Sequence, residues 1–230
     1  MFYYGFDYTY LIFVLPAIVI SLFAQAKVST TFSKYSRVVN KRFITGAKVA
    51  RLILDSYGLT NVKIEHVKGN LTDHYDPKSK VLRLSDSVYD SASIASLGVS
   101  AHECGHAIQH AKSYLPIKIR NKIFPVVSIS SSLSIPLIII GLIVNTPNLL
   151  LAGIILFSFV VLFQLITLPV EFNASKRALV ILSDASYLDN DEIKGAKKVL
   201  SAAALTYVAS ALTSLMQLLR FLVLANNRRD

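Results

Sequence analysis

The chain has 230 residues, of which 53% are hydrophobic and 17% are charged, so it is too apolar for an ordinary soluble domain of this length. Its formal net charge is +10, but the basic residues cluster beside apolar runs, which is typical of membrane topology and not of nucleic-acid binding. The single cysteine, Cys104, excludes an internal disulfide, and we interpret it as a small filler residue.

Residues 8–26 form an uncharged run of about the length that a bilayer requires, and we expect a transmembrane anchor there. Residues 24–26 (AQA) are similar to a signal-peptidase site, but no Lys or Arg precedes the run, as a signal peptide would require. Basic residues after the run place the N-terminus outside and residue 27 onward in the cytoplasm, where they could also contact anionic lipid headgroups. These residues are Lys27, Lys34, Arg37, Lys41, Arg42, Lys48 and Arg51.

Residues 45–58 carry apolar positions at helical spacing and end at Gly58, which predicts a helix with a glycine after its last turn. Residues 62–67 alternate apolar and polar side chains, as a half-buried strand does. Residues 70–85 predict a hairpin with its turn at 76–79. We therefore expect a small antiparallel sheet, which either offers an edge to an extended substrate or only covers the next helix.

That next helix is predicted from about residue 90 or 91 to about residue 113, and it carries His102 and His106. Residues four apart on a helix lie one above the other, so both imidazoles can present a nitrogen to one metal ion. Glu103 points about 100° round the helix, where it can reach a metal-bound water. This H-E-x-x-H spacing predicts a Zn²⁺ ion with Glu103 as the base that activates its water.

The same helix carries two other patterns. Ser100 and Glu103 match a capping box, which would start the helix later. His110 continues the four-residue series, but eight helical residues advance about 12 Å, which excludes His102 and His110 as ligands of one ion. The third histidine of the metzincins would fall at Lys112, which excludes that class.

Residues 125–144 and 148–168 each reach the length of a bilayer span, and the turn between them carries no Lys or Arg. We expect a transmembrane hairpin with this turn outside. Charge then places residues 27–124 and 169–198 on the same, cytoplasmic side, as a metal site with ligands from both segments requires. The basic residues that flank the hairpin are Lys112, Lys118, Arg120, Lys122, Lys176 and Arg177.

Glu171 is the first charged residue after this hairpin, and its carboxylate could fold back on the histidine pair as the third ligand. An ordinary acidic residue beside the membrane is the alternative. Pro169 suits either the first turn of a new helix or a kink in a continuing one. Other acids compete for the role, but they cluster in a polar, loop-like segment; they are Asp184, Asp189, Asp191 and Glu192.

Residues 196–225 are apolar but rich in Ala, Ser and Thr, and they predict either a fourth transmembrane helix or a helix at the interface over the site. If this helix crossed the membrane, Arg228 and Arg229 would lie outside, against the charge rule. Tyr207 and Arg177 are candidates to stabilise an oxyanion at a peptide carbonyl, with structural roles as the alternative.

Several stretches carry a family resemblance: residues 71–77 (LTDHYDP), 101–110 (AHECGHAIQH), 168–175 (LPVEFNAS) and 202–210 (AAALTYVAS). H-E-x-x-H with a downstream helical Glu resembles the gluzincins. Together the stretches resemble the YugP-type membrane neutral zinc metallopeptidases of bacteria over nearly the whole chain.

This resemblance implies a zinc-dependent endopeptidase with metal ligands His102, His106 and Glu171 and the general base Glu103. The more distant HtpX and CAAX prenyl protease relatives use an E-x-x-x-D pattern, whose acid would fall at Ser175 here. A carboxylate that orients a ligand histidine is therefore missing at that position, and Asn173 or Ser175 could substitute for it.

The expected fold is a mainly α membrane protein with a small antiparallel β-sheet, a zincin-like metal helix and three to four transmembrane helices. Its expected segments are an N-terminal transmembrane anchor (1–26), a cytoplasmic zincin-like region with the HExxH helix (27–124), a transmembrane hairpin (125–168), a third-ligand helix (169–198) and a C-terminal membrane-associated helix (199–230).

The expected function is hydrolysis of peptide bonds by a multi-pass enzyme of the cell membrane, with its site on the cytoplasmic side. Its partners would be the lipid bilayer and peptide or protein substrates, including membrane proteins, and not nucleic acid. A site-2-type intramembrane protease is one alternative, although it carries H-E-x-x-H within a spanning segment and Lys112 follows the motif here. A non-enzymatic membrane scaffold that binds metal structurally is the other.

Overall fold

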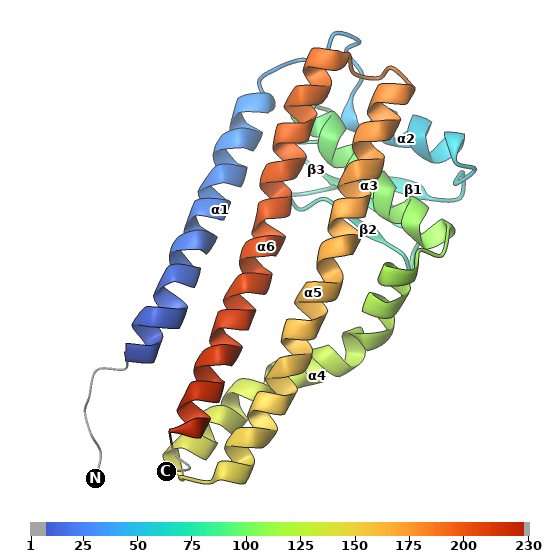
Figure 1. The fold of residues 1–230 in the computed structure, drawn as a ribbon. Coiled ribbons are helices and arrows are strands. Elements are labelled where there is room, and N and C mark those ends of the chain that lie inside the picture. Colours follow the sequence, from blue (N-terminus) through green and yellow to red (C-terminus); the bar gives the residue numbers. More distant parts are fainter. Residues whose placement is uncertain (1–7, 228–230) are drawn as a thin grey trace. The chain divides into compact units, whose positions relative to one another are not determined.

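The computed structural model describes residues 8–227, and these residues are mostly helical (Figure 1). A short π-helical segment, Tyr10–Val14, leads into α1 (Leu15–Tyr35). The next elements are α2 (Gly46–Ser56), β1 (Lys63–Val67), β2 (His74–Asp76) and β3 (Val81–Ser85). The remaining elements are α3 (Ile94–Ala111), α4 (Leu115–Ile143), α5 (Pro147–Asp184) and α6 (Asn190–Asn226).

The described chain divides into two compact units. The helical unit holds residues 8–24, 119–168 and 206–227, and the mixed unit holds residues 25–118 and 169–205. Helices α1, α4, α5 and α6 each contribute residues to both units. The same four helices are long and apolar enough to cross a membrane, in agreement with the three to four predicted. Residues 1–7 of the predicted anchor, together with Arg228 and Arg229, lie outside the described residues.

In the helical unit, α4 and α5 form the predicted helical hairpin. Its turn is shorter than expected because Pro147 already opens α5. Proline suits a first helical position, where its missing N–H would have no partner in the helix. Gly141 allows the two backbones to approach, since a Cβ there would lie 2.6 Å from the backbone nitrogen of Leu150. The side chains packed in this unit are Ile138, Leu150, Ile154, Phe157, Val161 and Phe221.

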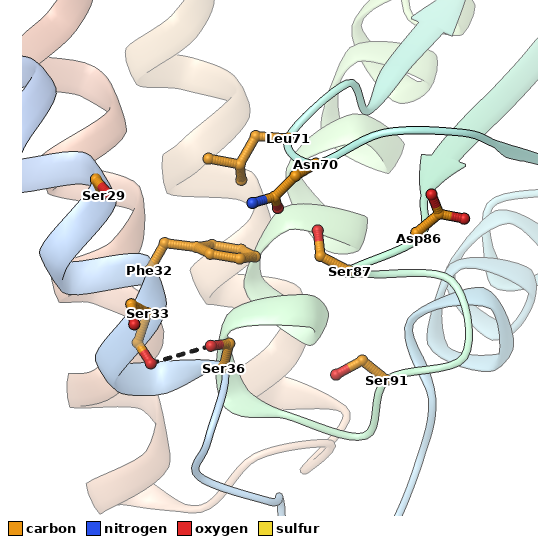
Figure 2. A pocket seen from close by; sticks show the side chains of 9 residues that line it. All are labelled: Ser29, Phe32, Ser33, Ser36, Asn70, Leu71, Asp86, Ser87 and Ser91. Carbon is orange, nitrogen blue, oxygen red and sulfur yellow. Dashed lines mark hydrogen bonds between the residues drawn. The ribbon is translucent and has the colours of Figure 1, made fainter.

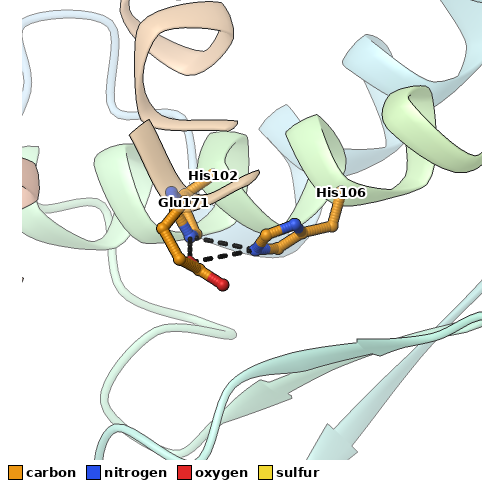
Figure 3. Close-up of side chains that lie close together, drawn as sticks. All are labelled: His102, His106 and Glu171. Atoms are coloured by element: carbon orange, nitrogen blue, oxygen red, sulfur yellow. Dashed lines mark hydrogen bonds and ion pairs between the residues drawn. The ribbon is translucent and has the colours of Figure 1, made fainter. Parts of the chain in front are cut away.

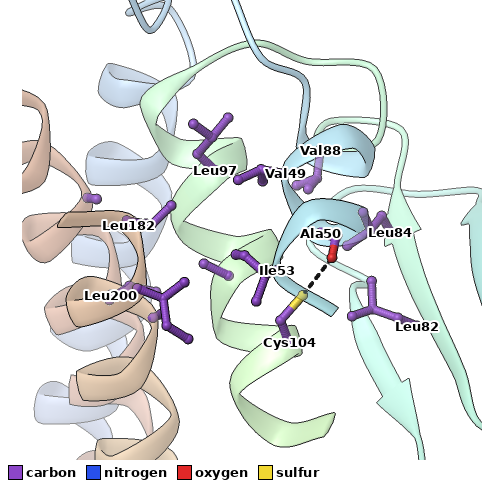
Figure 4. Close-up of a cluster of buried hydrophobic side chains, with 14 of the residues drawn as sticks. Val49, Ala50, Ile53, Leu82, Leu84, Val88, Leu97, Cys104, Leu182 and Leu200 are labelled. Carbon is purple, nitrogen blue, oxygen red and sulfur yellow. Dashed lines mark hydrogen bonds between the residues drawn. The ribbon is translucent and has the colours of Figure 1, made fainter. Parts of the chain in front are cut away.

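In the mixed unit, α2 packs its apolar face against α3. The side chain of Thr45 caps α2 by accepting a hydrogen bond from the backbone N–H of Lys48, and Gly58 follows the helix with a φ of 71°. Beneath α2, the Cys104 thiol donates to the carbonyl oxygen of Ala50 at 3.6 Å (Figure 4). Burial raises the pKa of this thiol, so Cys104 stays neutral and acts as a core residue. The neighbouring core side chains include Val49, Ile53, Leu82, Leu84, Val88, Leu97, Leu182 and Leu200.

The sheet differs from the prediction in one pairing. The predicted hairpin is present, because β2 and β3 are antiparallel with Tyr75 opposite Leu82. Strand β1, however, lies on the other side of β3 and runs parallel to it, so the sheet is mixed and not wholly antiparallel. The strand order β1-β3-β2 places the most apolar strand, β3, in the centre, where it is almost fully buried. The apolar strand β3 is paired on both sides, and this central position sets the strand order. The alternation of side chains within β1 could not indicate which strand it pairs with.

Helix α3 begins a few residues later than predicted. Its N-cap is Ser93, whose side chain accepts a hydrogen bond from the backbone N–H of Ser96 at 3.1 Å. Ser100 lies inside the helix and is buried, so it does not form the capping box that its spacing from Glu103 suggested. The helix therefore has more than two turns before His102, and these turns are anchored in the core of the mixed unit.

Candidate metal centre

Three side chains from α3 and α5 converge in the mixed unit (Figure 3). The Nε2 atoms of His102 and His106 lie 3.2 Å apart. Glu171 places its Oε2 atom 3.3 Å from Nε2 of His102 and 3.5 Å from Nε2 of His106. The structure thus brings together the three residues that the sequence predicts as metal ligands.

These separations fit a zinc ion. Ligand atoms about 2.0–2.1 Å from a tetrahedral zinc ion lie about 3.3–3.4 Å from one another, and the three observed separations are 3.2, 3.3 and 3.5 Å. Two imidazole nitrogens and one carboxylate oxygen are also a donor set that zinc prefers in catalytic sites. The three side chains are 12%, 13% and 3% exposed, so their polar atoms are largely removed from solvent. The residues present therefore fit a bound zinc ion.

Glu171 reaches the histidines because α5 continues as one helix through Pro169. The acid shares one buried face of α5 with Ala174 and Ala178. This face lies very close to α3, since a Cβ added to Gly105 would be 2.8 Å from the carbonyl oxygen of Ala174. Gly105, one of the two unspecified letters of the H-E-x-x-H motif, therefore allows the close approach that carries Glu171 to the histidines. Sequence analysis did not single out this glycine.

A chain of hydrogen bonds fixes His106 from behind. Arg177 Nε donates to Oδ1 of Asn173 at 2.7 Å, so this oxygen is an acceptor. Gln109 Nε2 donates to the same oxygen at 3.0 Å and to the carbonyl of Val170 at 2.8 Å. The other amide atom of Gln109, Oε1, then lies 3.0 Å from Nδ1 of His106 and can only accept from it. Nδ1 therefore carries a proton, so that in the neutral imidazole the lone pair is on Nε2, which faces the site.

His102 has a different support. Its Nδ1 atom lies 3.1 Å from the hydroxyl of Ser175. Of the two residues suggested as substitutes for the missing carboxylate, Ser175 thus contacts a ligand histidine directly, whereas Asn173 reaches His106 only through Gln109. A hydroxyl can donate or accept, so Ser175 orients the ring without fixing its tautomer as firmly as a carboxylate would.

Glu103 lies beside the cluster on α3. It is 9% exposed, and no hydrogen bond or ion pair engages its carboxylate within residues 8–227. Burial lowers the pKa of His106, but the hydrogen bond with Glu171 and the charges of Glu103 and Glu171 outweigh it, so the pKa of His106 is raised. The Glu103 carboxylate is therefore close enough to influence the site electrostatically.

Three of the four competing acids have other partners, and the fourth, Asp184, is an exposed residue at the end of α5. Asp189 pairs with Lys41, and it forms a capping box with Glu192 at the start of α6. Glu192 is buried and also accepts from the backbone N–H of Lys41 at 2.8 Å, so this acid is not the solvated loop residue that its sequence context suggested. Asp191 pairs with Lys194.

The structure also describes His110, Arg177 and Tyr207. The ring of His110 packs against the ring of Tyr75 in β2, with 5.6 Å between the two centroids. His110 therefore contacts the sheet and is not a member of the metal-ligand cluster. Of the two oxyanion candidates, Arg177 is engaged by Asn173. Tyr207 belongs to the helical unit.

Comparison with known proteins identifies the family of the chain. A family model described as "Putative neutral zinc metallopeptidase" matches residues 10–226. The chain is also 51% identical to "Putative membrane protease YugP" of Bacillus subtilis (strain 168) over 216 residues, which is 94% of this chain and 96% of that relative. No solved structure matches the chain. The family model spans nearly the whole chain, and the Bacillus subtilis protein is identical to the chain at half of the aligned positions. This chain therefore belongs to the neutral zinc metallopeptidase family.

Proposed function

We propose that the chain is a zinc-dependent endopeptidase of the cell membrane, with His102, His106 and Glu171 as metal ligands and Glu103 as general base. The observation that carries this proposal is the convergence of three ligand atoms at the separations of a tetrahedral zinc site. The membership of the chain in a metallopeptidase family supports the reaction class.

Zinc, when bound, acts as a Lewis acid and lowers the pKa of a water molecule towards neutrality. The chain's own residues do the rest. Glu103 accepts the proton of the attacking water and passes it to the leaving amine. Gln109 holds the proton of His106 on Nδ1, so that Nε2 is available as a ligand throughout the reaction.

The sheet offers a binding surface for an extended substrate. Strand β2 packs against α3 and is an end strand of the sheet, so its outer edge is not paired with another described strand. A peptide that adds itself along this edge would be held by backbone hydrogen bonds, which tolerate varied sequences. This supports unfolded or extended protein segments as substrates.

The charge distribution supports a cytoplasmic site. Basic residues are dense between positions 27 and 51, in the first turns of α4 and in the C-terminal part of α5, whereas the turn between α4 and α5 lacks Lys and Arg. Both segments that supply metal ligands would then lie on the cytoplasmic side. Helix α3 is not among the four helices apolar enough to cross a membrane, which favours this enzyme over a site-2-type intramembrane protease.

Replacement of Glu103 by Gln tests the mechanism. The variant should bind zinc as the wild type does, because Glu103 is not a ligand, and should lose about 10²- to 10⁴-fold in cleavage rate, because the base is absent. Cleavage of an unfolded soluble protein by the detergent-purified chain measures the rate, and metal analysis measures the zinc. A variant that retains zinc and cleaves at the wild-type rate would exclude Glu103 as the base. A wild-type chain that binds zinc but cleaves nothing would favour the scaffold alternative.

A further inference from the structure

A groove of about 840 Å³ in the mixed unit lies between α1 and α6 and is rich in lysine. The five lysines that line it are Lys27 and Lys34 on α1 and Lys194, Lys197 and Lys198 on α6. Lys27 and Lys34 are seven positions apart on α1, and Lys194 precedes Lys197 by three positions and Lys198 by four on α6, which places each set on one side of its helix. Thr30, Thr31 and Ser201 line the same groove, and the Thr30 hydroxyl donates to the backbone carbonyl of Ala26 at 2.8 Å.

The charge in this groove is largely unneutralised. Lys194 pairs with Asp191, its Nζ lying 2.8 Å from Oδ1. Within residues 8–227, no carboxylate lies within ion-pair distance of the other four lysines. Like charges gathered in one hollow raise a positive potential and attract an anion.

A second hollow in the same unit shows the contrast (Figure 2). It has a volume of about 600 Å³ and is lined mainly by serines, with Asp86 as its charged residue. Asp86 is already satisfied, because it lies 2.7 Å from Nε2 of His66 and accepts from the backbone N–H of Gly69 at 2.8 Å. The charged residue of that hollow is therefore already paired, whereas four of the five lysines in the groove have no paired carboxylate among residues 8–227.

The position of the lysines along their helices indicates the source of the anion. Lys27 is the first charged residue after the uncharged run 8–26 of the first helix. Lys198 is the last charged residue before the uncharged run 199–219 of α6. For helices that cross a bilayer, the boundary between an uncharged run and a basic segment lies at the depth of the lipid headgroups.

The groove also has an apolar part. Ala202 and Leu205 line it one and two turns beyond Lys198, within the uncharged run of α6. A ligand that fills the whole groove therefore needs a negatively charged group at one end and an apolar group at the other. Inorganic phosphate meets only the first requirement.

We propose that this groove binds an anionic phospholipid, with its phosphate held by the lysines and an acyl chain lying along Ala202 and Leu205. The site is separate from the candidate metal ligands and does not depend on peptidase activity. Each basic residue near an anionic lipid contributes about 1 kcal/mol, which corresponds to about a fivefold change in affinity.

The test is lipid binding to the full chain in a neutral detergent, measured by native mass spectrometry over a range of lipid concentrations. Phosphatidylglycerol should bind in preference to phosphatidylcholine. A triple variant, Lys34→Gln, Lys197→Gln and Lys198→Gln, should weaken phosphatidylglycerol binding on the order of a hundredfold. The matched control is Lys63→Gln, Lys78→Gln and Lys80→Gln, which removes the same charge from exposed lysines outside the groove and should leave the affinity within about twofold.

Four outcomes would overturn the proposal. These are equal binding of phosphatidylcholine, an unchanged affinity in the triple variant, an equal loss in the control, and full displacement of phosphatidylglycerol by inorganic phosphate at the same concentration as the lipid. Thermal unfolding checks that the variants are folded. If the triple variant does not fold, Lys197→Gln with Lys198→Gln takes its place, with an expected loss of about 25-fold.

Discussion

At the scale of single residues, the two candidate histidine ligands could be predicted from the sequence because their spacing follows from helix geometry. Residues four apart share a face, so His102 and His106 identify each other without knowledge of the fold. Gln109 was not singled out, because its role depends on Asn173 and Val170, which are brought to it only by the packing of α5 on α3. A glutamine three positions after a ligand histidine, on the same helix face, is the signal that could have found it.

Gln109→Ala should weaken zinc binding by about 10- to 100-fold, because the proton of His106 is then no longer held on Nδ1. Competition with a chelating dye measures this affinity without reference to activity. The matched control is Gln25→Ala on α1, an exposed glutamine, which should leave the affinity unchanged. Equal zinc affinity in the Gln109 variant and the wild type would show that the hydrogen bond does not support the ligand.

At the scale of elements, local sequence patterns predicted the helices and the β2–β3 hairpin. They did not predict the pairing of β1 with β3, which are farther apart in the sequence. Turn residues fix a hairpin within a short stretch of chain. The parallel pairing of β1 with β3 depends on how β1 also packs against α2, which no local pattern encodes. The same reasoning applies to α3 and α5, whose close contact depends on Gly105.

Gly105→Ala should separate α3 from α5, because the added Cβ would lie 2.8 Å from a backbone oxygen that cannot rotate away. Overpacking of this kind costs about 1–3 kcal/mol, and the displaced Glu171 should also weaken zinc binding. Denaturant unfolding in detergent and chelator competition measure the two effects.

Gly98→Ala on the same helix is the control. Its Cβ would meet Ala196 at 3.7 Å, an ordinary contact, and alanine favours a helix over glycine by about 1 kcal/mol. This variant should be as stable as the wild type or more so. If both variants behave alike, the close approach at Gly105 does not position Glu171.

At the scale of the whole molecule, composition alone indicates a membrane protein. Four helices have the length and apolar character of membrane-spanning helices, and basic residues cluster toward one end of their apolar stretches. The division of the chain into two units was not predicted, because each unit joins segments from distant parts of the sequence. Both segments that carry candidate metal ligands nevertheless belong to the mixed unit. The charge rule likewise predicts that these two segments lie on the same side of the membrane.

Cysteine labelling in intact cells tests the orientation. A cysteine at Asn148, at the α4–α5 turn, should react with a membrane-impermeant maleimide from outside. A cysteine at Ser79, in the β2–β3 turn, should react only after the cells are opened. The native Cys104 is buried and should not contribute to the signal. Labelling of Ser79→Cys in intact cells would place the metal centre outside.

The central claim is that Glu171 completes the zinc site begun by His102 and His106. The most direct measurement is the zinc content of purified Glu171→Ala beside that of Asp184→Ala, an exposed acid on the same helix. The wild type and Asp184→Ala should each hold one zinc ion per chain, and Glu171→Ala should lose it on dialysis, because two imidazoles alone bind zinc weakly. Full retention of zinc by Glu171→Ala after the same dialysis would contradict the proposed centre.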